Sequence, residues 1–195
     1  MKRVGLTGPT GAGKSTALAV LRDMGGLVLD ADEVYHELLE TSEPMKTALI
    51  ARFGRDILDE SGKIDRRRLS GVVYDGGLDD LNAITHKFVI AELDRRVAAS
   101  AAPFAAIDAI NLIESGVGDA CDATVAVLAP AELRLKRVMA RDGVDESYAR
   151  RRIAAQPGDD FYRKSCGHVL ENRAEDTPES FQARARALFR EILAG

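Results

Sequence analysis

The sequence lacks three features that mark secreted, membrane-embedded or generally nucleic-acid-binding proteins. It has only two cysteines in 195 residues. Neither Cys121 nor Cys166 stands in a metal-type or redox-type pair, so we expect free thiols in a reducing compartment. No apolar run could span a bilayer, and the short apolar stretch after the N-terminus does not make a signal peptide. The formal net charge of −4 argues against a uniformly basic surface. We therefore expect a cytoplasmic protein without a membrane or nucleic-acid partner.

The composition is that of a globular domain, with 46% hydrophobic and 30% charged residues. Apolar runs indicate buried strands at 3–7, 27–32, 104–110, 123–129 and 167–172. Helical spacing occupies most of the chain between these runs. The order of strand, glycine loop, helix and strand at the start is that of a parallel βαβ unit. We predict an α/β fold in which helices wrap a five-stranded parallel sheet.

Two helical insertions interrupt this predicted sheet. The first, at about 33–102, lies between the second and third strands, and the second, at about 131–164, lies between the fourth and fifth. The core then comprises about 1–32, 103–130 and 165–195. The length suits a single domain, 1–195, that carries both insertions as small lobes.

The segment GPTGAGKS, residues 8–15, fits the pattern G-x-x-x-x-G-K-[ST] at every fixed position. In such a loop, backbone N–H groups surround an anion, and the following helix directs its positive end at it. Lys14 is expected to reach the terminal phosphates of a nucleotide, and the Ser15 hydroxyl to ligate Mg²⁺. Because the segment lies between a predicted strand and a predicted helix, it predicts a P-loop NTPase fold.

A P-loop alone does not distinguish a kinase, a GTPase and an ATP-driven motor. The guanine-reading tetrapeptide N-K-x-D does not occur in the sequence, and a motor needs a longer chain. A small kinase needs an acceptor site, a group that orients the acceptor hydroxyl, and a lid that excludes water. The sequence offers a candidate for each. Two alternatives stay open: a different small-molecule or nucleoside monophosphate kinase, and a regulator that binds ATP without transferring phosphate.

Carboxylates stand at the ends of two predicted strands. Asp30 and Asp32 are expected at the carboxyl end of the second strand, which faces the ligand crevice in an open α/β sheet. Asp32 is the preferred group to accept or orient the proton of an acceptor hydroxyl, although it could instead cap the next helix. Asp108 follows the third strand. It is a candidate second ligand of Mg²⁺, with loop capping as the alternative.

Arginines crowd the second insertion. Solvated helix faces with i,i+4 pairing explain most of them. One or two could instead clamp the transferring phosphate as parts of a mobile lid. The six arginines are Arg134, Arg137, Arg141, Arg150, Arg151 and Arg152.

Several motifs together resemble the dephospho-CoA kinase family. After the glycine loop these are DAD, LNAITH, DAINLIES and RVMARDGVDESYARRRIAAQ, so the resemblance runs from Gly5 to about Asn172. It implies transfer of the γ-phosphate of ATP to the 3′-hydroxyl of dephospho-CoA, with Mg²⁺ as cofactor. It also implies a nucleotide-binding core, a helical CoA-binding lobe formed by the first insertion, and a helical lid formed by the second.

The resemblance also implies roles for single residues. Asp32 would be the base near the 3′-hydroxyl, and Arg141 would be the lid arginine on the phosphates. His86 would lie near the acceptor, although without the resemblance it is an ordinary helical histidine. Around the acceptor site the chain departs from the family, because DAINLIES lacks the usual proline and THK replaces THP. The residues expected to bind ATP are Gly11, Ala12, Gly13, Lys14, Ser15, Thr16 and Asn172.

Overall fold

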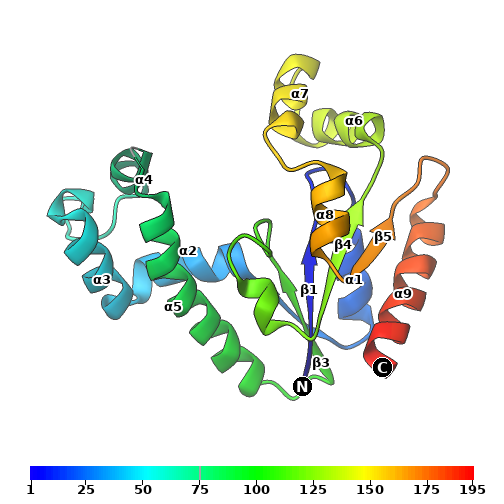
Figure 1. Cartoon of the computed structure of the whole chain (residues 1–195), viewed down its shortest axis with the longest axis horizontal. Helices are drawn as coiled ribbons and strands as arrows, with labels where there is room; N and C mark the ends of the chain where they lie inside the picture. Colours follow the sequence, from blue (N-terminus) through cyan, green and yellow to red (C-terminus); the bar gives the residue numbers. More distant parts are fainter. Residues whose placement is uncertain (75) are drawn as a thin grey trace. The chain divides into compact units, whose positions relative to one another are not determined.

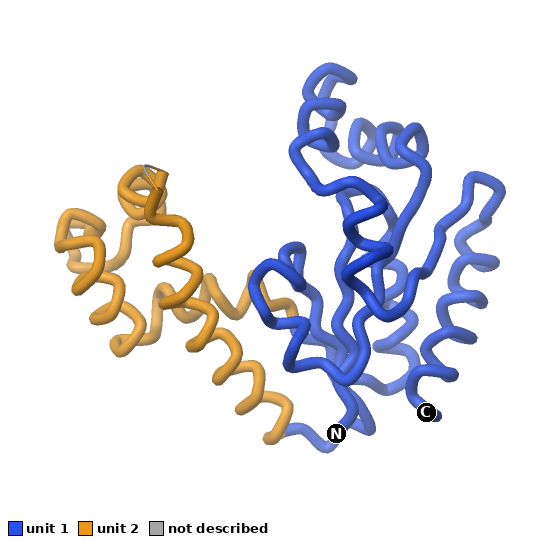
Figure 2. Tube along the Cα trace, viewed as in Figure 1, with its two compact units in different colours: residues 1–29, 100–195 blue, residues 30–99 orange. Residues whose placement is uncertain are grey.

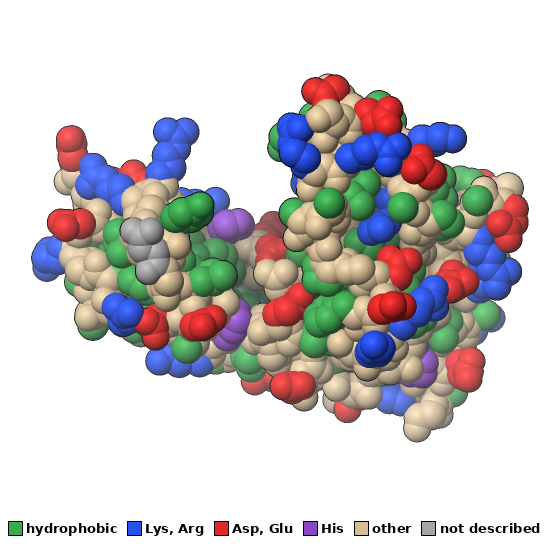
Figure 3. Space-filling model, turned by 45° about the horizontal axis from the view of Figure 1, so that its top comes forward, with side chains coloured by type: hydrophobic (Ala, Val, Ile, Leu, Met, Phe, Trp, Pro, Cys, Tyr) green, Lys and Arg blue, Asp and Glu red, His purple; other side chains and the backbone are tan. Residues whose placement is uncertain are grey.

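The computed structural model describes residues 1–74 and 76–195, which form two compact units (Figures 1 and 2). Unit 1 comprises Met1–Leu29 and Ser100–Gly195, and unit 2 comprises Asp30–Ala99. Figure 3 shows acidic and basic side chains interspersed on the visible face of each unit. Within the described ranges, no helix is both long enough and apolar enough to cross a membrane.

Unit 1 contains a five-stranded sheet with the strand order β2-β3-β1-β4-β5 (Figure 1). The β1–β3, β1–β4 and β4–β5 pairs are parallel. The predicted α/β fold with a five-stranded parallel sheet is confirmed. The strands are β1 (Lys2–Thr7), β2 (Leu27–Asp30), β3 (Phe104–Asp108), β4 (Ala123–Leu128) and β5 (His168–Glu171).

Helices cover both faces of this sheet. Val125 and Val127 of β4 pack in the cluster that contains α1 (Lys14–Asp23) and α9 (Pro178–Ala194). The alternate residues Ala126 and Leu128 point to the other face, where they pack against α8 (Asp159–Ser165). The helical pattern of α8 was not recognised in the sequence. Because β4 is buried on both sides, it reads as a continuous apolar run.

Two helices extend unit 1 beyond β4. They are α6 (Ala131–Asp142) and α7 (Glu146–Ala154), which form a hairpin around a small apolar cluster of their own. Gly143 ends α6 in a left-handed conformation with φ of 65°. A short 3₁₀ helix, η2 (Val117–Ala120), lies between β3 and β4.

The second strand is shorter than the sequence indicated. It ends at Asp30, whose Oδ1 accepts hydrogen bonds from the N–H groups of Asp32 (2.8 Å) and Glu33 (3.1 Å). Asp30 is therefore the N-cap of α2 (Ala31–Thr41). Asp32 lies in the first turn of that helix, so its assignments to the strand and to the capping position are both wrong. These capping hydrogen bonds start the helix directly after Asp30, two residues before the strand end expected from the sequence.

Unit 2 is helical and has a separate core. Its buried residues include Leu39, Met45, Leu49 and Ile57. The elements after α2 are α3 (Glu43–Phe53), η1 (Arg55–Ile57), α4 (Arg66–Tyr74) and α5 (Leu78–Ala98).

Candidate active site

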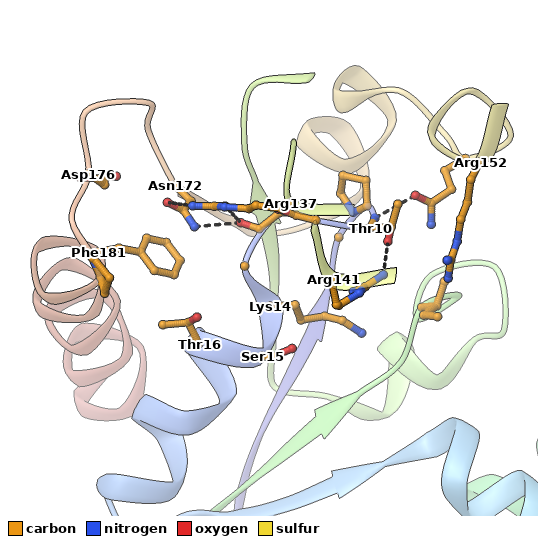
Figure 4. A pocket seen from close by; sticks show the side chains of 18 of the residues that line it. Thr10, Lys14, Ser15, Thr16, Arg137, Arg141, Arg152, Asn172, Asp176 and Phe181 are labelled. Atoms are coloured by element: carbon orange, nitrogen blue, oxygen red, sulfur yellow. Dashed lines mark hydrogen bonds between the residues drawn. The ribbon is translucent and has the colours of Figure 1, made fainter. Parts of the chain in front are cut away.

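The glycine loop between β1 and α1 lines a cavity of about 450 Å³ (Figure 4). Gly8 has φ of 146°, and a Cβ there would lie 2.2 Å from the carbonyl oxygen of Val127. Gly13 has φ of 106°, and a Cβ there would lie 2.4 Å from Asn172 Nδ2. Either side chain would be strained and would collide with its neighbour. The packing of the loop against β4 and Asn172 thus requires glycine at both glycine positions of the motif.

The first turn of α1 faces the cavity with Lys14, Ser15 and Thr16 (Figure 4). This turn contains no acidic side chain. The partial positive charge of the helix N-terminus is therefore not offset by a carboxylate within the turn. The arrangement can bind an anion through the loop N–H groups, the helix end and the Lys14 ammonium.

Lys14 forms an ion pair with Asp108 at the carboxyl edge of the sheet. Its Nζ contacts Asp108 Oδ1, and only 18% and 13% of the two side chains are exposed. Asp108 ends β3, which is the neighbour of β1 in the sheet. The sheet thus brings both predicted residues together beside the cavity.

Arg137 lines the cavity and binds carbonyl oxygens of the glycine loop. Its Nη1 donates to the carbonyl oxygens of Gly11 (3.2 Å) and Ala12 (3.4 Å), and its Nη2 donates to Asn172 Oδ1 (3.3 Å). Burial lowers the pKa of this guanidinium, which nevertheless stays charged at neutral pH because arginine titrates so high. Arg137 therefore fixes the loop and adds positive charge at the cavity.

Two more residues of the second insertion contact the loop at Thr10. Arg141 Nη2 donates to Thr10 Oγ1 (3.3 Å), and the Thr10 N–H donates to Gln156 Oε1 (2.8 Å). Arg152 also lines the cavity (Figure 4). Three of the six arginines thus face the nucleotide loop. Gln156 was not recognised from the sequence, because its partner lies 146 positions away.

The other three arginines do not line the cavity. Arg150 pairs with Glu146 and Glu132, and Arg151 donates to the Ser147 hydroxyl. The interpretation as a paired helix face is correct for these two residues. Arg134 is buried, with Nη2 3.8 Å from a carboxylate oxygen of Asp159.

Asn172 connects the sheet to the loop. Its side chain is buried, and its Nδ2 donates to the Ala12 carbonyl oxygen (3.0 Å). Its backbone N–H donates to the Leu128 carbonyl oxygen at the end of β4 (2.7 Å). Asn172 is thus committed to protein partners at the edge of the cavity. Sequence reasoning missed the residues that follow it along the cavity wall, which are Asp176, Thr177, Pro178 and Phe181.

Comparisons with known proteins agree with this geometry. The family model described as "Dephospho-CoA kinase" matches residues 2–177. The chain belongs to the dephospho-CoA kinase family. A relative with that name from Corynebacterium glutamicum is 36% identical over 99% of this chain and 98% of its own length. Another from Moorella thermoacetica is 32% identical over 97% of this chain and 91% of its own length.

Solved structures are similar to this chain in fold. TT1252 from Thermus thermophilus is 32% identical with a TM-score of 0.78, and the match covers 97% of each chain. A dephospho-CoA kinase from Campylobacter jejuni (22% identity, TM-score 0.66) covers 100% of this chain and 99% of its own. Shikimate kinase from Acinetobacter baumannii has 18% identity and a TM-score of 0.54, and the match covers 100% of this chain and 94% of that chain. At these lower identities the likeness concerns the fold, and it confirms the predicted P-loop kinase fold.

The acceptor residues expected for this family lie in unit 2. Asp32 is exposed, and no partner for its carboxylate is found in the part of the chain that the structure describes. His86 is half-buried on α5, and burial lowers the pKa of its imidazole. At neutral pH the ring is therefore uncharged and able both to donate and to accept a hydrogen bond.

The oxygen donors beside the loop fit a nucleotide-bound Mg²⁺. Among the residues that the structure describes, no cluster of three or more His, Cys, Asp or Glu side chains is arranged to hold a metal. The Ser15 hydroxyl lines the cavity, and the Asp108 carboxylate lies beside Lys14. Mg²⁺ prefers such hard oxygen ligands and in nucleotide sites takes one or two carboxylates together with substrate phosphates. The donor set thus matches the requirements of this ion.

Proposed function

We propose that the chain transfers the γ-phosphate of ATP to the 3′-hydroxyl of dephospho-CoA, giving coenzyme A and ADP. The observation that carries this proposal is membership of the dephospho-CoA kinase family over nearly the whole chain. The intact phosphate-binding loop and the arginine-lined cavity beside it support it. The free thiols of Cys121 and Cys166 support the further proposal that the enzyme acts in the cytoplasm.

The nucleotide would lie along the cavity with its phosphates on the loop. The N–H groups from Gly11 to Thr16 would bind the phosphate oxygens, as in other P-loops. The end lined by Pro178 and Phe181 offers apolar surface for the base. Asn172 would act there by fixing the loop, because its amide already binds the Ala12 carbonyl.

Lys14 and the lid arginines would stabilise the charge that develops during transfer. Lys14 is held at the edge of the sheet by Asp108, from which its flexible side chain can turn to the terminal phosphates. Bound Mg²⁺ supplies charge neutralisation at the phosphates, and Ser15 and Asp108 are its proposed ligands. Arg141 would contact the transferring phosphate from the α6–α7 hairpin, which we propose closes as a lid.

Asp32 would orient the acceptor hydroxyl and accept its proton. Its carboxylate is exposed and has no partner among the described residues, so it is available for a substrate hydrogen bond. In a loose phosphoryl-transfer transition state, the attacking oxygen needs orientation more than early deprotonation. His86, uncharged at neutral pH, would bind the acceptor through a ring nitrogen.

An acceptor screen tests the proposed reaction. ADP release from ATP and Mg²⁺ should be stimulated by dephospho-CoA and not by AMP, CMP, UMP or shikimate. Lys14→Ala should reduce turnover by about a hundredfold, the usual scale for a preorganised charge contact at the reacting group. Equal stimulation by another acceptor, or near-full activity of Lys14→Ala, would contradict the proposal.

Asp32→Asn tests the role of the acceptor carboxylate. We expect kcat to fall by about a hundredfold, the scale of a positioned acid–base group, while ATP-analogue affinity stays unchanged. Asp30→Asn is the matched control, because asparagine caps helices as well as aspartate does. If Asp30→Asn were the more damaging change, the assignment of Asp32 would be wrong.

A further inference from the structure

Asp142 joins two cavity-lining arginines that come from different helices. It is the last residue of α6, and its Oδ1 accepts a hydrogen bond from Arg141 Nε (2.7 Å). Its Oδ2 accepts from Arg141 Nη2 (3.0 Å) and from Nη1 of Arg152 on α7 (2.7 Å). One carboxylate thus holds both guanidinium groups, and it also connects the two arms of the hairpin.

The ion pairs leave the arginines able to bind a further anion. Asp142 occupies the Nε edge of Arg141, and Thr10 accepts a second bond from Nη2. Nη1 of Arg141, and Nε and Nη2 of Arg152, have no partner in the described ranges. Arg141 and Arg152 line the cavity beside the loop, whereas Asp142 does not. The free N–H groups can therefore bind phosphate oxygens without release of the carboxylate.

The Asp142 carboxylate also reduces the repulsion between the two guanidinium groups. Two guanidinium groups brought to one anion site repel each other, and long arginine side chains lose rotamer entropy when they are fixed there. A shared carboxylate offsets the repulsion and fixes both side chains before the nucleotide binds. Hydrogen bonds from Arg141 hold the pKa of Asp142 below its ordinary value, so the carboxylate is ionised at neutral pH.

We propose that Asp142 is a positioning residue that holds Arg141 and Arg152 as a paired clamp for the nucleotide phosphates. The proposal rests on the proposed ATP-dependent transfer. It extends that transfer by giving Arg152 a phosphate contact and Asp142 a role through both arginines. Donors fixed in advance need no reorganisation when charge develops on the transferring group.

Asp142→Asn tests the clamp, with Glu146→Gln as its matched control. Glu146 lies on the same hairpin and pairs with Arg150 (2.8 Å), which does not line the cavity. Each variant removes one negative charge; Asp142→Asn disrupts the ion pairs with Arg141 and Arg152, and Glu146→Gln disrupts the pair with Arg150. We expect Asp142→Asn to lower kcat by about tenfold through misplacement of the clamp, and to weaken the binding of a non-hydrolysable ATP analogue severalfold. Glu146→Gln should change both quantities by less than about twofold.

A double-mutant cycle separates positioning from a merely structural role. If Asp142 acts through the arginines, Asp142→Asn should cause no further loss of kcat in an Arg141→Ala/Arg152→Ala background. An additive loss would overturn the proposal. So would an unchanged kcat, or tighter analogue binding, which would mean that Asp142 competes with the phosphates for the arginines.

Thermal unfolding controls for damage to the hairpin. If Asp142→Asn lowers Tm more than Glu146→Gln does, Asp142→Glu replaces it, because glutamate keeps the charge and shifts it by one methylene. Asp142→Glu should have a kcat between those of the unmodified enzyme and Asp142→Asn, and a kcat equal to that of Asp142→Asn would overturn the proposal. The analogue-binding measurements keep the clamp testable even if dephospho-CoA proves not to be the acceptor.

Discussion

Asn172→Ala should loosen the nucleotide-binding loop. The substitution removes the hydrogen bond from Nδ2 to the Ala12 carbonyl oxygen (3.0 Å), and 4% of Asn172 and 1% of Ala12 are exposed. The carbonyl would keep only the longer contact with Arg137 Nη1 (3.4 Å). Loss of this buried bond, with a partly unsatisfied acceptor, costs about 2 kcal/mol. In a chain of this size that corresponds to a decrease in Tm of about 4–8 °C.

Differential scanning calorimetry and an ATP-analogue titration measure the two consequences. The analogue should bind severalfold more weakly, because the loop no longer keeps one conformation before binding. Asn111→Ala is the control, since Asn111 is exposed and its Tm change should stay within about 2 °C. Asn172→Asp should destabilise at least as much as Asn172→Ala, because it keeps the volume but directs a carboxylate oxygen at a carbonyl. Unchanged Tm in both Asn172 variants would refute the reasoning.

Three further predictions concern other parts of the molecule. Arg137→Met should weaken ATP-analogue binding by about tenfold, the scale of one lost charge-assisted contact. Calorimetric titration measures this affinity, and an unchanged affinity would contradict the prediction. Hydrogen bonds from the arginines three and four positions later lower the pKa of Glu92 to about 2 from 4.5. The ionised carboxylate therefore stabilises unit 2 fully above pH 4.5. In urea unfolding, Glu92→Gln should be less stable than the unmodified protein above this pH, and the difference in unfolding free energy should vanish as the pH falls through about 2. Gly5→Ala should cost about 1–3 kcal/mol by overpacking, since its Cβ would lie 2.8 Å from Leu112 Cδ2. Gly71→Ala, in a helix with open space, should instead raise Tm slightly.

The sequence predicted the features that local patterns determine. The glycine loop and the five buried strands follow from short-range residue preferences, and the structure has both. The segment DAD was ambiguous, because either carboxylate can cap a helix and the choice depends on where the strand ends. That point is set by pairing within the sheet, which a local pattern does not contain.

The arginines show the same division. Arg137 and Arg141 stand four positions apart and so share a helix face, which the sequence does indicate. Which way that face points depends on the packing of α6 and α7 against each other and the loop. The contact between Thr10 and Gln156 joins segments far apart in the chain, so only the fold reveals it.

The contacts of Arg137 and Asn172 with the loop concern its carbonyl oxygens. A trans peptide group is planar, and its C=O and N–H bonds point in opposite directions. Donors that hold the Ala12 carbonyl from one side therefore turn the Gly13 N–H towards the other. The direction of the Gly13 N–H is thus set by the two side chains that bind the Ala12 carbonyl oxygen. A substitution at either position would therefore change the orientation of one peptide plane as well as remove a side chain from the cavity wall.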